Sequence, residues 1–242
     1  MKLILSPAKT MRKEEDLAPW GRPQFLAETA ELLDALKALS PKERKALWKC
    51  SDSIASLNEA RLAGMNLEAG SSPALYSYSG LAYTHLSPES LSDKELSYLE
   101  EHLRILSGFY GILRPMDGIV SYRLEMAAPL QVKGAKNLYE FWGDRLAKTF
   151  GEETVIDLAS EEYSSAVTPY LSKGQRIQVI FAQESNGKLT VKGTFAKMAR
   201  GDLTRWMAEE GIEHPNELIR YDRGYHYDPS ASDPEHYVFI KE

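Results

Sequence analysis

The segment His102–Met126 constrains the fold most, because a helical leucine pattern runs into glycines there. Leucines recur at three- and four-residue steps between residues 96 and 106, which is typical of one face of an amphipathic helix. Gly108 and Gly111 then interrupt the pattern. The spacing predicts a helix over residues 93–106, followed by a glycine turn and a second short apolar segment.

A helix followed by a glycine turn can offer backbone N–H groups to a phosphate. Arg104, Arg114 and Arg123 lie close by in the sequence and could add positive charge to the same anion. Gly108 and Gly111 also fit an ordinary helix C-cap followed by a tight turn. The pattern alone therefore leaves a phosphate site and a plain turn both open.

Short apolar strands and amphipathic helices alternate along the chain, which is typical of a mixed α/β (α+β) fold. Residues 2–5 and 154–158 are short, apolar runs that predict buried strands. Further strands are predicted at 74–78, 176–182, 188–195, 218–221 and 236–241, with a turn at 185–187, and helices at 25–39, 41–61, 138–150 and 196–210. Because no linker or repeat divides the chain, we expect one domain over residues 1–242.

Composition favours a globular protein of the cytoplasm. Of the 242 residues, 43% are hydrophobic and 26% are charged, enough apolar material for a substantial core. No apolar run approaches the ~20 residues of a membrane span, and the N-terminus lacks a signal-peptide pattern. The one cysteine, Cys50, cannot form an intramolecular disulfide and fits a reducing compartment. We expect no membrane partner, and the oligomeric state stays open.

Three basic residues stand at positions suited to ligand binding. Lys9 follows the strand at 2–5, where open α/β sheets place ligands, although an exposed loop lysine is the commoner case. Lys197 and Arg200 share one face of the helix at 196–210, opposite its apolar side. Such a basic stripe suits phosphate contact, and an ordinary solvated helix face is the alternative.

Other chemistries find little support in the sequence. Glu140 and Asp144, four apart on a predicted helix, could present paired carboxylates or could simply be solvated. The glycine-rich motifs of nucleotide cofactors and the serine-hydrolase elbow are absent. The five histidines show no metal-ligand spacing. The sequence therefore predicts no cofactor and no metal site.

Five sequence blocks resemble, in order, the YaaA family of bacterial peroxide stress proteins. The blocks are L-I-L-S-P-A-K-T at 3–10, L-R-I-L-S-G-F-Y-G-I-L-R-P-M-D at 103–117 with Y-R-L-E-M at 122–126, L-Y-E-F-W-G-D at 138–144, I-D-L-A-S-E-E-Y at 156–163 and A-K-M-A-R-G at 196–201. This resemblance implies an unusual single-domain α/β fold with a helix-hairpin-helix-like element. It also implies resistance to hydrogen peroxide, lowered free intracellular iron and non-specific binding of duplex DNA.

The resemblance suggests which residues form the site. Gly108 and Gly111 would hold the phosphate backbone. The expected basic residues are Lys9, Arg114, Arg123, Lys197 and Arg200, and the expected supporting residues are Tyr122, Glu125, Glu140, Trp142, Asp144 and Glu161. Because the net charge is −6, the chain can bind a polyanion only if its cations are gathered. We therefore expect the five basic residues to converge on one cleft.

A second hypothesis is enzymatic. Lys9 could be a catalytic amine that attacks a damaged base, an abasic sugar or a nucleotide, as lysines do in some DNA-repair proteins. Direct sequestration of iron is less favoured, since the sequence contains no visible cluster of metal ligands.

Overall fold

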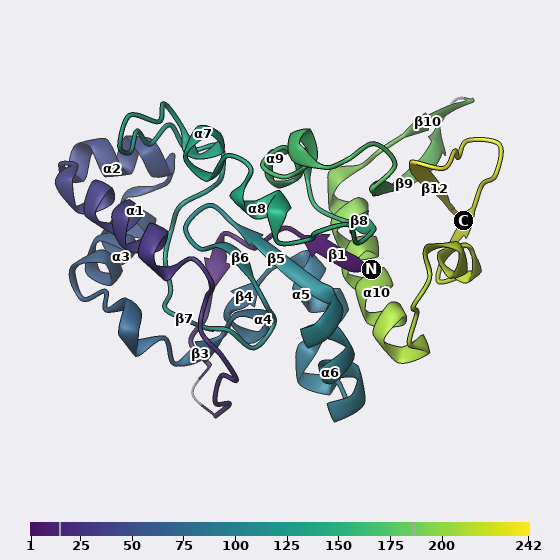
Figure 1. Ribbon diagram of the computed structural model, residues 1–242, viewed down its shortest axis with the longest axis horizontal. Helices are drawn as coiled ribbons and strands as arrows, with labels where there is room; N and C mark the ends of the chain where they lie inside the picture. Colours follow the sequence, from purple (N-terminus) through teal and green to yellow (C-terminus); the bar gives the residue numbers. More distant parts are fainter. Residues whose placement is uncertain (15, 186) are drawn as a thin grey trace.

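The fold is built around an eight-stranded mixed sheet in the computed structural model, which describes residues 1–14, 16–185 and 187–242 (Figure 1). The strand order is β11 (Tyr225–Tyr227), β12 (His236–Lys241), β9 (Arg176–Ser185), β8 (Val155–Asp157), β1 (Lys2–Leu5), β5 (Leu103–Ser107) and β6 (Gly111–Leu113), with β10 (Lys188–Thr190) paired to β9. Two small ladders join β2 (Thr10–Met11) to β4 (Tyr78–Ser79) and β3 (Ser72–Pro73) to β7 (Gly118–Ile119).

The helices surround this sheet. They are α1 (Leu26–Ala38), α2 (Pro41–Trp48), α3 (Asp52–Ala63), α4 (Ala74–Ser77), α5 (Leu81–Leu86), α6 (Asp93–His102), α7 (Leu138–Trp142), α8 (Arg145–Lys148), α9 (Glu161–Ser164) and α10 (Gly193–Glu210), with 3₁₀ turns at Leu67–Ala69, Pro88–Ser90, Thr168–Tyr170 and Pro215–Arg220. In Figure 1, α1, α2 and α3 gather at one end of the molecule, and the C-terminal strands lie at the other. A single apolar core runs through both parts, so the predicted single-domain α/β fold is confirmed.

The strand order reverses beside β1. This strand pairs in parallel with β5 on one side, Leu3 opposite Leu103, and with β8 on the other, Leu3 opposite Ile156. The chain first adds β5 and β6 on one side of β1 and then returns to add β8, β9 and β12 on the other. In open α/β sheets, ligands bind beyond the carboxyl ends of the strands at such a reversal.

Helix α10 is held unusually close to α5. A Cβ atom on Gly201 would lie 1.9 Å from the carbonyl oxygen of Ala82, so only glycine allows this approach. Leu203 and Met207 of α10 are completely buried. The close contact fixes the position of α10, and with it the side chains of Lys197 and Arg200.

Predictions that depend on local sequence are confirmed. Ser40 with Glu43, and Ser92 with Glu95, form the capping boxes that start α2 and α6. The strands predicted at 2–5, 154–158, 176–182 and 236–241 and the helix at 196–210 are present within a few residues of their expected bounds. The turn predicted at 185–187 includes residue 186, which lies outside the described residues.

The helix predicted over residues 93–106 ends earlier, at His102, and the chain continues as strand β5. Every residue of β5 except Arg104 is buried, because β5 lies between β1 and β6 inside the sheet. A strand buried on both faces carries a continuous apolar run, and such a run cannot be told from a helix by periodicity. The leucine spacing therefore extended the predicted helix too far.

Five other predicted elements are wrong in part. The strand predicted at 188–195 ends at Thr190, and α10 already begins at Gly193. The helix at 41–61 is divided by Lys49, which has a left-handed conformation (φ 45°), and the helix at 138–150 is divided by Gly143 (φ 52°). The strand predicted at 74–78 is mainly the short helix α4, and the one at 218–221 falls largely in a 3₁₀ turn. Each break changes which side chains share a face, and this matters most for Glu140 and Asp144.

Candidate functional site

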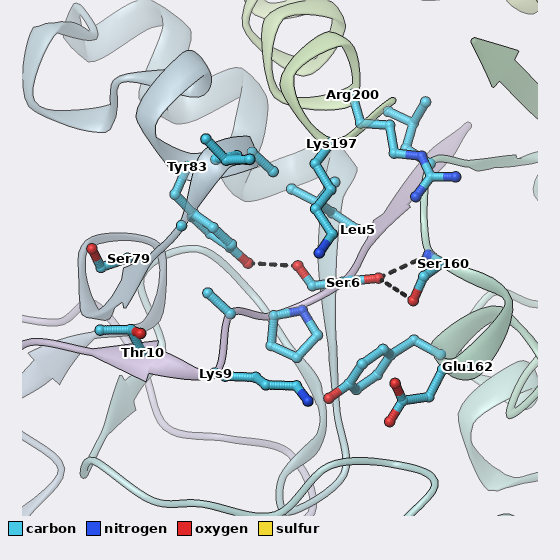
Figure 2. A pocket seen from close by; sticks show the side chains of 17 residues that line it. Leu5, Ser6, Lys9, Thr10, Ser79, Tyr83, Ser160, Glu162, Lys197 and Arg200 are labelled. Carbon is cyan, nitrogen blue, oxygen red and sulfur yellow. Dashed lines mark hydrogen bonds between the residues drawn. The ribbon is translucent and has the colours of Figure 1, made fainter. Parts of the chain in front are cut away.

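A crevice of about 330 Å³ opens at the carboxyl ends of β1 and β8, where the strand order reverses. Its lining comes from four segments that are far apart in the sequence, namely residues 5–10, 79–83 and 158–163 and helix α10. We call it the switch-point crevice. Figure 2 shows side chains from these segments facing one another.

Ser6 ties the walls of the switch-point crevice together. Its hydroxyl oxygen accepts a hydrogen bond from the backbone N–H of Ser160 at 2.8 Å and lies 3.2 Å from the Ser160 hydroxyl. The hydroxyl of Tyr83 donates to the Ser6 carbonyl oxygen at 3.0 Å (Figure 2). These contacts join the loop after β1 to the loop after β8 and to α5. Direct hydrogen bonds therefore fix the walls of the crevice relative to one another.

Lys197 and Arg200 enter the switch-point crevice from α10. Figure 2 shows Lys197 descending beside Ser6 and Arg200 extending over Ser160. Burial lowers the pKa of the Arg200 guanidinium, and the charge of Asp157 opposes that shift. The Arg200 Nε atom is buried and has no hydrogen-bond partner among the described residues. A buried guanidinium N–H without a partner is costly, so an anion in the crevice that accepts from it would stabilise Arg200.

Asp157 does not serve as that anion, although it is the acidic group that acts on Arg200. Its Oδ1 accepts the N–H of Ala159 at 2.9 Å, and its Oδ2 accepts the Ser164 hydroxyl at 2.5 Å and the Arg176 Nε at 2.8 Å. These bonds hold Asp157 at the end of β8. Arg200 thus keeps its donors available to a ligand.

Lys9 lies at the rim and connects the switch-point crevice to a buried ion pair. Its Nζ is 3.7 Å from Glu125 Oε1, which lies 2.9 Å from Arg123 Nη2. The Lys9 side chain is 66% exposed, whereas those of Arg123 and Glu125 are only 11% and 14% exposed. Arg123 also approaches the Trp48 carbonyl oxygen at the end of α2. Lys9 can therefore reach a ligand, and Arg123 mainly positions Glu125.

Arg114 does not join the other predicted basic residues at the crevice lining. Its guanidinium lies 3.2 Å from Asp117 and 3.7 Å from Glu100. Burial raises the pKa of Asp117, and hydrogen bonding and charge from Arg114 oppose that shift. Because Asp117 is three residues away and also accepts the Arg114 backbone N–H, this arginine stabilises its own turn. The predicted convergence therefore includes Lys9, Lys197 and Arg200, with Arg123 adjacent.

Gly108 and Gly111 do not form an exposed phosphate-binding turn. They lie in a buried hairpin that joins β5 to β6, and the Ser107 hydroxyl already accepts the N–H groups of Phe109 and Tyr110. A Cβ on Gly108 would meet the Leu124 carbonyl oxygen at 2.6 Å. Packing thus explains these glycines, and the segment at which the helix-hairpin-helix-like element was expected is a β-hairpin. Two helices joined by a tight turn occur elsewhere, at α2 and α3.

The predicted supporting residues separate into two groups. Tyr122 is buried beside Lys9 and bonds the hydroxyls of Tyr78 and Ser107, and burial raises its pKa to about 12. Glu125 holds Lys9 and Arg123, as described above. The remaining four are not among the residues that line the crevice: Trp142 is buried against Gly111, Glu140 accepts the Lys136 N–H, Asp144 pairs with Lys148, and Glu161 is exposed on α9.

Sequence reasoning missed Ser6, Tyr83, Ser160, Glu162 and Tyr163, all of which line the crevice. Ser6 directly follows β1, and Ser160 lies three residues beyond β8. The rule that ligands bind beyond the ends of parallel strands could have found both, once the two strands were known to be neighbours. Tyr83 carries no such signal, because α5 reaches the crevice only through its packing against α10.

Within residues 1–14, 16–185 and 187–242, no group of three or more His, Cys, Asp or Glu side chains is arranged to hold a metal ion. None of the helices in these same residues has the length and hydropathy needed to span a bilayer.

Comparison with known proteins shows a family over almost the whole chain. Residues 1–231 match the family model described as peroxide stress protein YaaA. A UPF0246 protein of Agathobacter rectalis is 44% identical over 247 residues, covering 100% of this chain and 99% of the relative. A UPF0246 protein of Lactiplantibacillus plantarum is 45% identical over 245 residues, covering 99% of each. The chain therefore belongs to the family of the peroxide stress protein YaaA.

Proposed function

We propose that this chain acts in the peroxide stress response by binding duplex DNA at the mouth of the switch-point crevice. Lys9 would contact the phosphate backbone at the rim, and Lys197 and Arg200 would contact it from α10. The observation that carries the proposal is the convergence of these three cations from opposite ends of the sequence. A chain of net charge −6 gains such a cluster only by folding.

The charges around the switch-point crevice support an anionic ligand. Neither Lys197 nor Arg200 has a carboxylate partner among the described residues. Three acidic side chains lie nearby, and all are engaged: Asp157 with Ser164 and Arg176, Glu125 with Arg123 and Lys9, and Glu162 with the Ala127 N–H. Lys197 and Arg200, which have no such partner, favour contact with phosphates, and phosphate contact is the main source of non-specific DNA affinity.

Salt dependence of DNA binding tests this proposal. The double variant Lys197→Gln/Arg200→Gln should reduce the magnitude of the slope of log K against log [salt] by about 1.8, since each lost phosphate contact contributes about 0.9 on B-DNA. Affinity for a fully paired oligonucleotide would be measured by fluorescence anisotropy at several salt concentrations. Lys94→Gln, an exposed lysine on α6 outside the crevice lining, is the matched control.

Arg114→Gln adds a second comparison, because the structure pairs Arg114 with Asp117 and Glu100. We expect this variant to leave the slope unchanged. An equal slope for the double variant and the unaltered chain, with both proteins folded, would refute the role of the switch-point crevice in DNA binding.

The alternative function, an enzyme that uses Lys9 as a nucleophile, stays a prediction. Nucleophilic lysines are activated by desolvation or by a neighbouring cation, whereas the Lys9 side chain is 66% exposed and faces Glu125. Borohydride reduction with abasic DNA tests it directly: a covalent adduct that forms with the unaltered chain and is lost in Lys9→Ala would establish Schiff-base chemistry. We expect no adduct. The link to intracellular iron and the cytoplasmic location likewise remain proposals.

A further inference from the structure

The size of the switch-point crevice limits what can enter it. A cavity of about 330 Å³ lies at the small end of the range for small-molecule sites. A DNA duplex, whose major groove alone is about 12 Å wide, can therefore touch only the rim. Lys9 lies at that rim, whereas Arg200 is half-buried and carries its unpaired Nε inside. Phosphates of a paired duplex that contact the ends of Lys197 and Arg200 at the mouth thus leave the buried Nε of Arg200 without a partner.

The lining of the switch-point crevice has a polar and an apolar part. Lys197 and Arg200 are three residues apart on α10 and so lie on the same side of the helix. Most of the remaining lining is carbon, contributed by Leu5, Pro7, Ala8, Leu81, Ala82 and Leu158 and by the rings of Tyr83 and Tyr163. A ligand that satisfies both parts needs an anionic group joined to a compact, largely planar body.

We infer that the switch-point crevice takes one unstacked nucleotide, with its phosphate at Lys197 and Arg200 and its base against the apolar lining. The nucleotide can come from an unpaired position in DNA or from free nucleoside monophosphate. This inference rests on the proposed function, because it assigns a ligand to the same crevice. An unpaired or damaged position costs least to extrude from a duplex, and this would direct the protein to such positions.

Two labelled duplexes with the same number of base pairs test the inference, one fully paired and one with a single-nucleotide bulge, which adds only one phosphate. We expect the bulged duplex to bind about tenfold more tightly, the gain of one favourable base contact. Leu81→Trp should fill the crevice and remove this preference, because Leu81 lines the crevice and is 41% exposed. Leu57→Trp, at a 50% exposed position on α3, is the matched control.

Calorimetry with deoxyadenosine monophosphate and with inorganic phosphate identifies the source of the nucleotide. Nucleotide binding in the absence of any duplex binding would support the crevice assignment with a free nucleotide as ligand and would refute the DNA proposal. Equal affinity for the two duplexes, without nucleotide binding, would overturn the inference and leave the DNA proposal standing. Phosphate binding as tightly as the nucleotide would also overturn it, because the crevice would then be an anion site without a place for the base.

Discussion

Replacing Trp142 by alanine is expected to lower the free energy of unfolding by about 3–5 kcal/mol, the usual cost of removing a buried tryptophan. Trp142 is fully buried, and its Nε1 donates to the Gly108 carbonyl oxygen at 3.1 Å. The ring also packs edge-on against Phe25 and Phe141. The variant therefore loses a large apolar contact and leaves a buried carbonyl oxygen without its donor.

Urea unfolding of the two proteins measures this effect. Trp20→Ala is the matched control, since Trp20 is 57% exposed and should change stability little. A loss below about 1 kcal/mol for Trp142→Ala would mean that the site collapses around the missing ring. We expect Trp142→Phe to retain DNA affinity, because Trp142 supports the β5–β6 hairpin and lies outside the crevice lining.

Gly201→Ala is expected to destabilise the fold by about 1–3 kcal/mol or more, as overpacking does in a close interface. The added Cβ would lie 1.9 Å from the Ala82 carbonyl oxygen, so α10 must move away from α5. Lys197 and Arg200 would move with it. The same variant should therefore bind duplex DNA more weakly in the anisotropy measurement, under conditions in which it remains folded.

The matched control for this variant lies in the same helix. A Cβ atom on Gly193 would meet no other described atom within 4 Å, so Gly193→Ala adds the same methyl group without a clash. On helix propensity alone, Gly193→Ala should leave the free energy of unfolding unchanged or raise it slightly. Equal stability of Gly201→Ala and Gly193→Ala would show that α10 can move away from α5 at little cost in free energy. The α5–α10 contact would then not fix the position of the cations.

Sequence reasoning succeeded where structure is determined by neighbouring residues. The capping boxes at Ser40 and Ser92 were predictable because each involves residues only three apart. Strand β5 was not, because its burial depends on β1, about 100 residues earlier, and its leucines fit a helical period equally well. The local pattern is compatible with a helix and with a strand, and long-range pairing selects between them.

The candidate site was predictable only in part for the same reason. Lys9, Lys197 and Arg200 could be identified by their positions beyond a strand and on a polar helix face. Their convergence depends on the close contact between Gly201 and Ala82, and no sequence pattern indicates that contact. Arg114 was assigned to the site although Asp117, three residues away, offered a local partner. A test for neighbouring carboxylates would have separated this structural arginine from the others.

The reversal of strand order beside β1 also has a consequence for synthesis of the protein. Ser6 and its partner Ser160 are 154 positions apart, which corresponds to roughly 8–30 s of translation at ~5–20 residues per second. Lys197 and Arg200 emerge later still. During that interval a nascent chain carries Lys9 without the opposite wall or the cations of α10. The complete crevice, and any binding that needs it, therefore belongs only to chains in which α10 has already been synthesised.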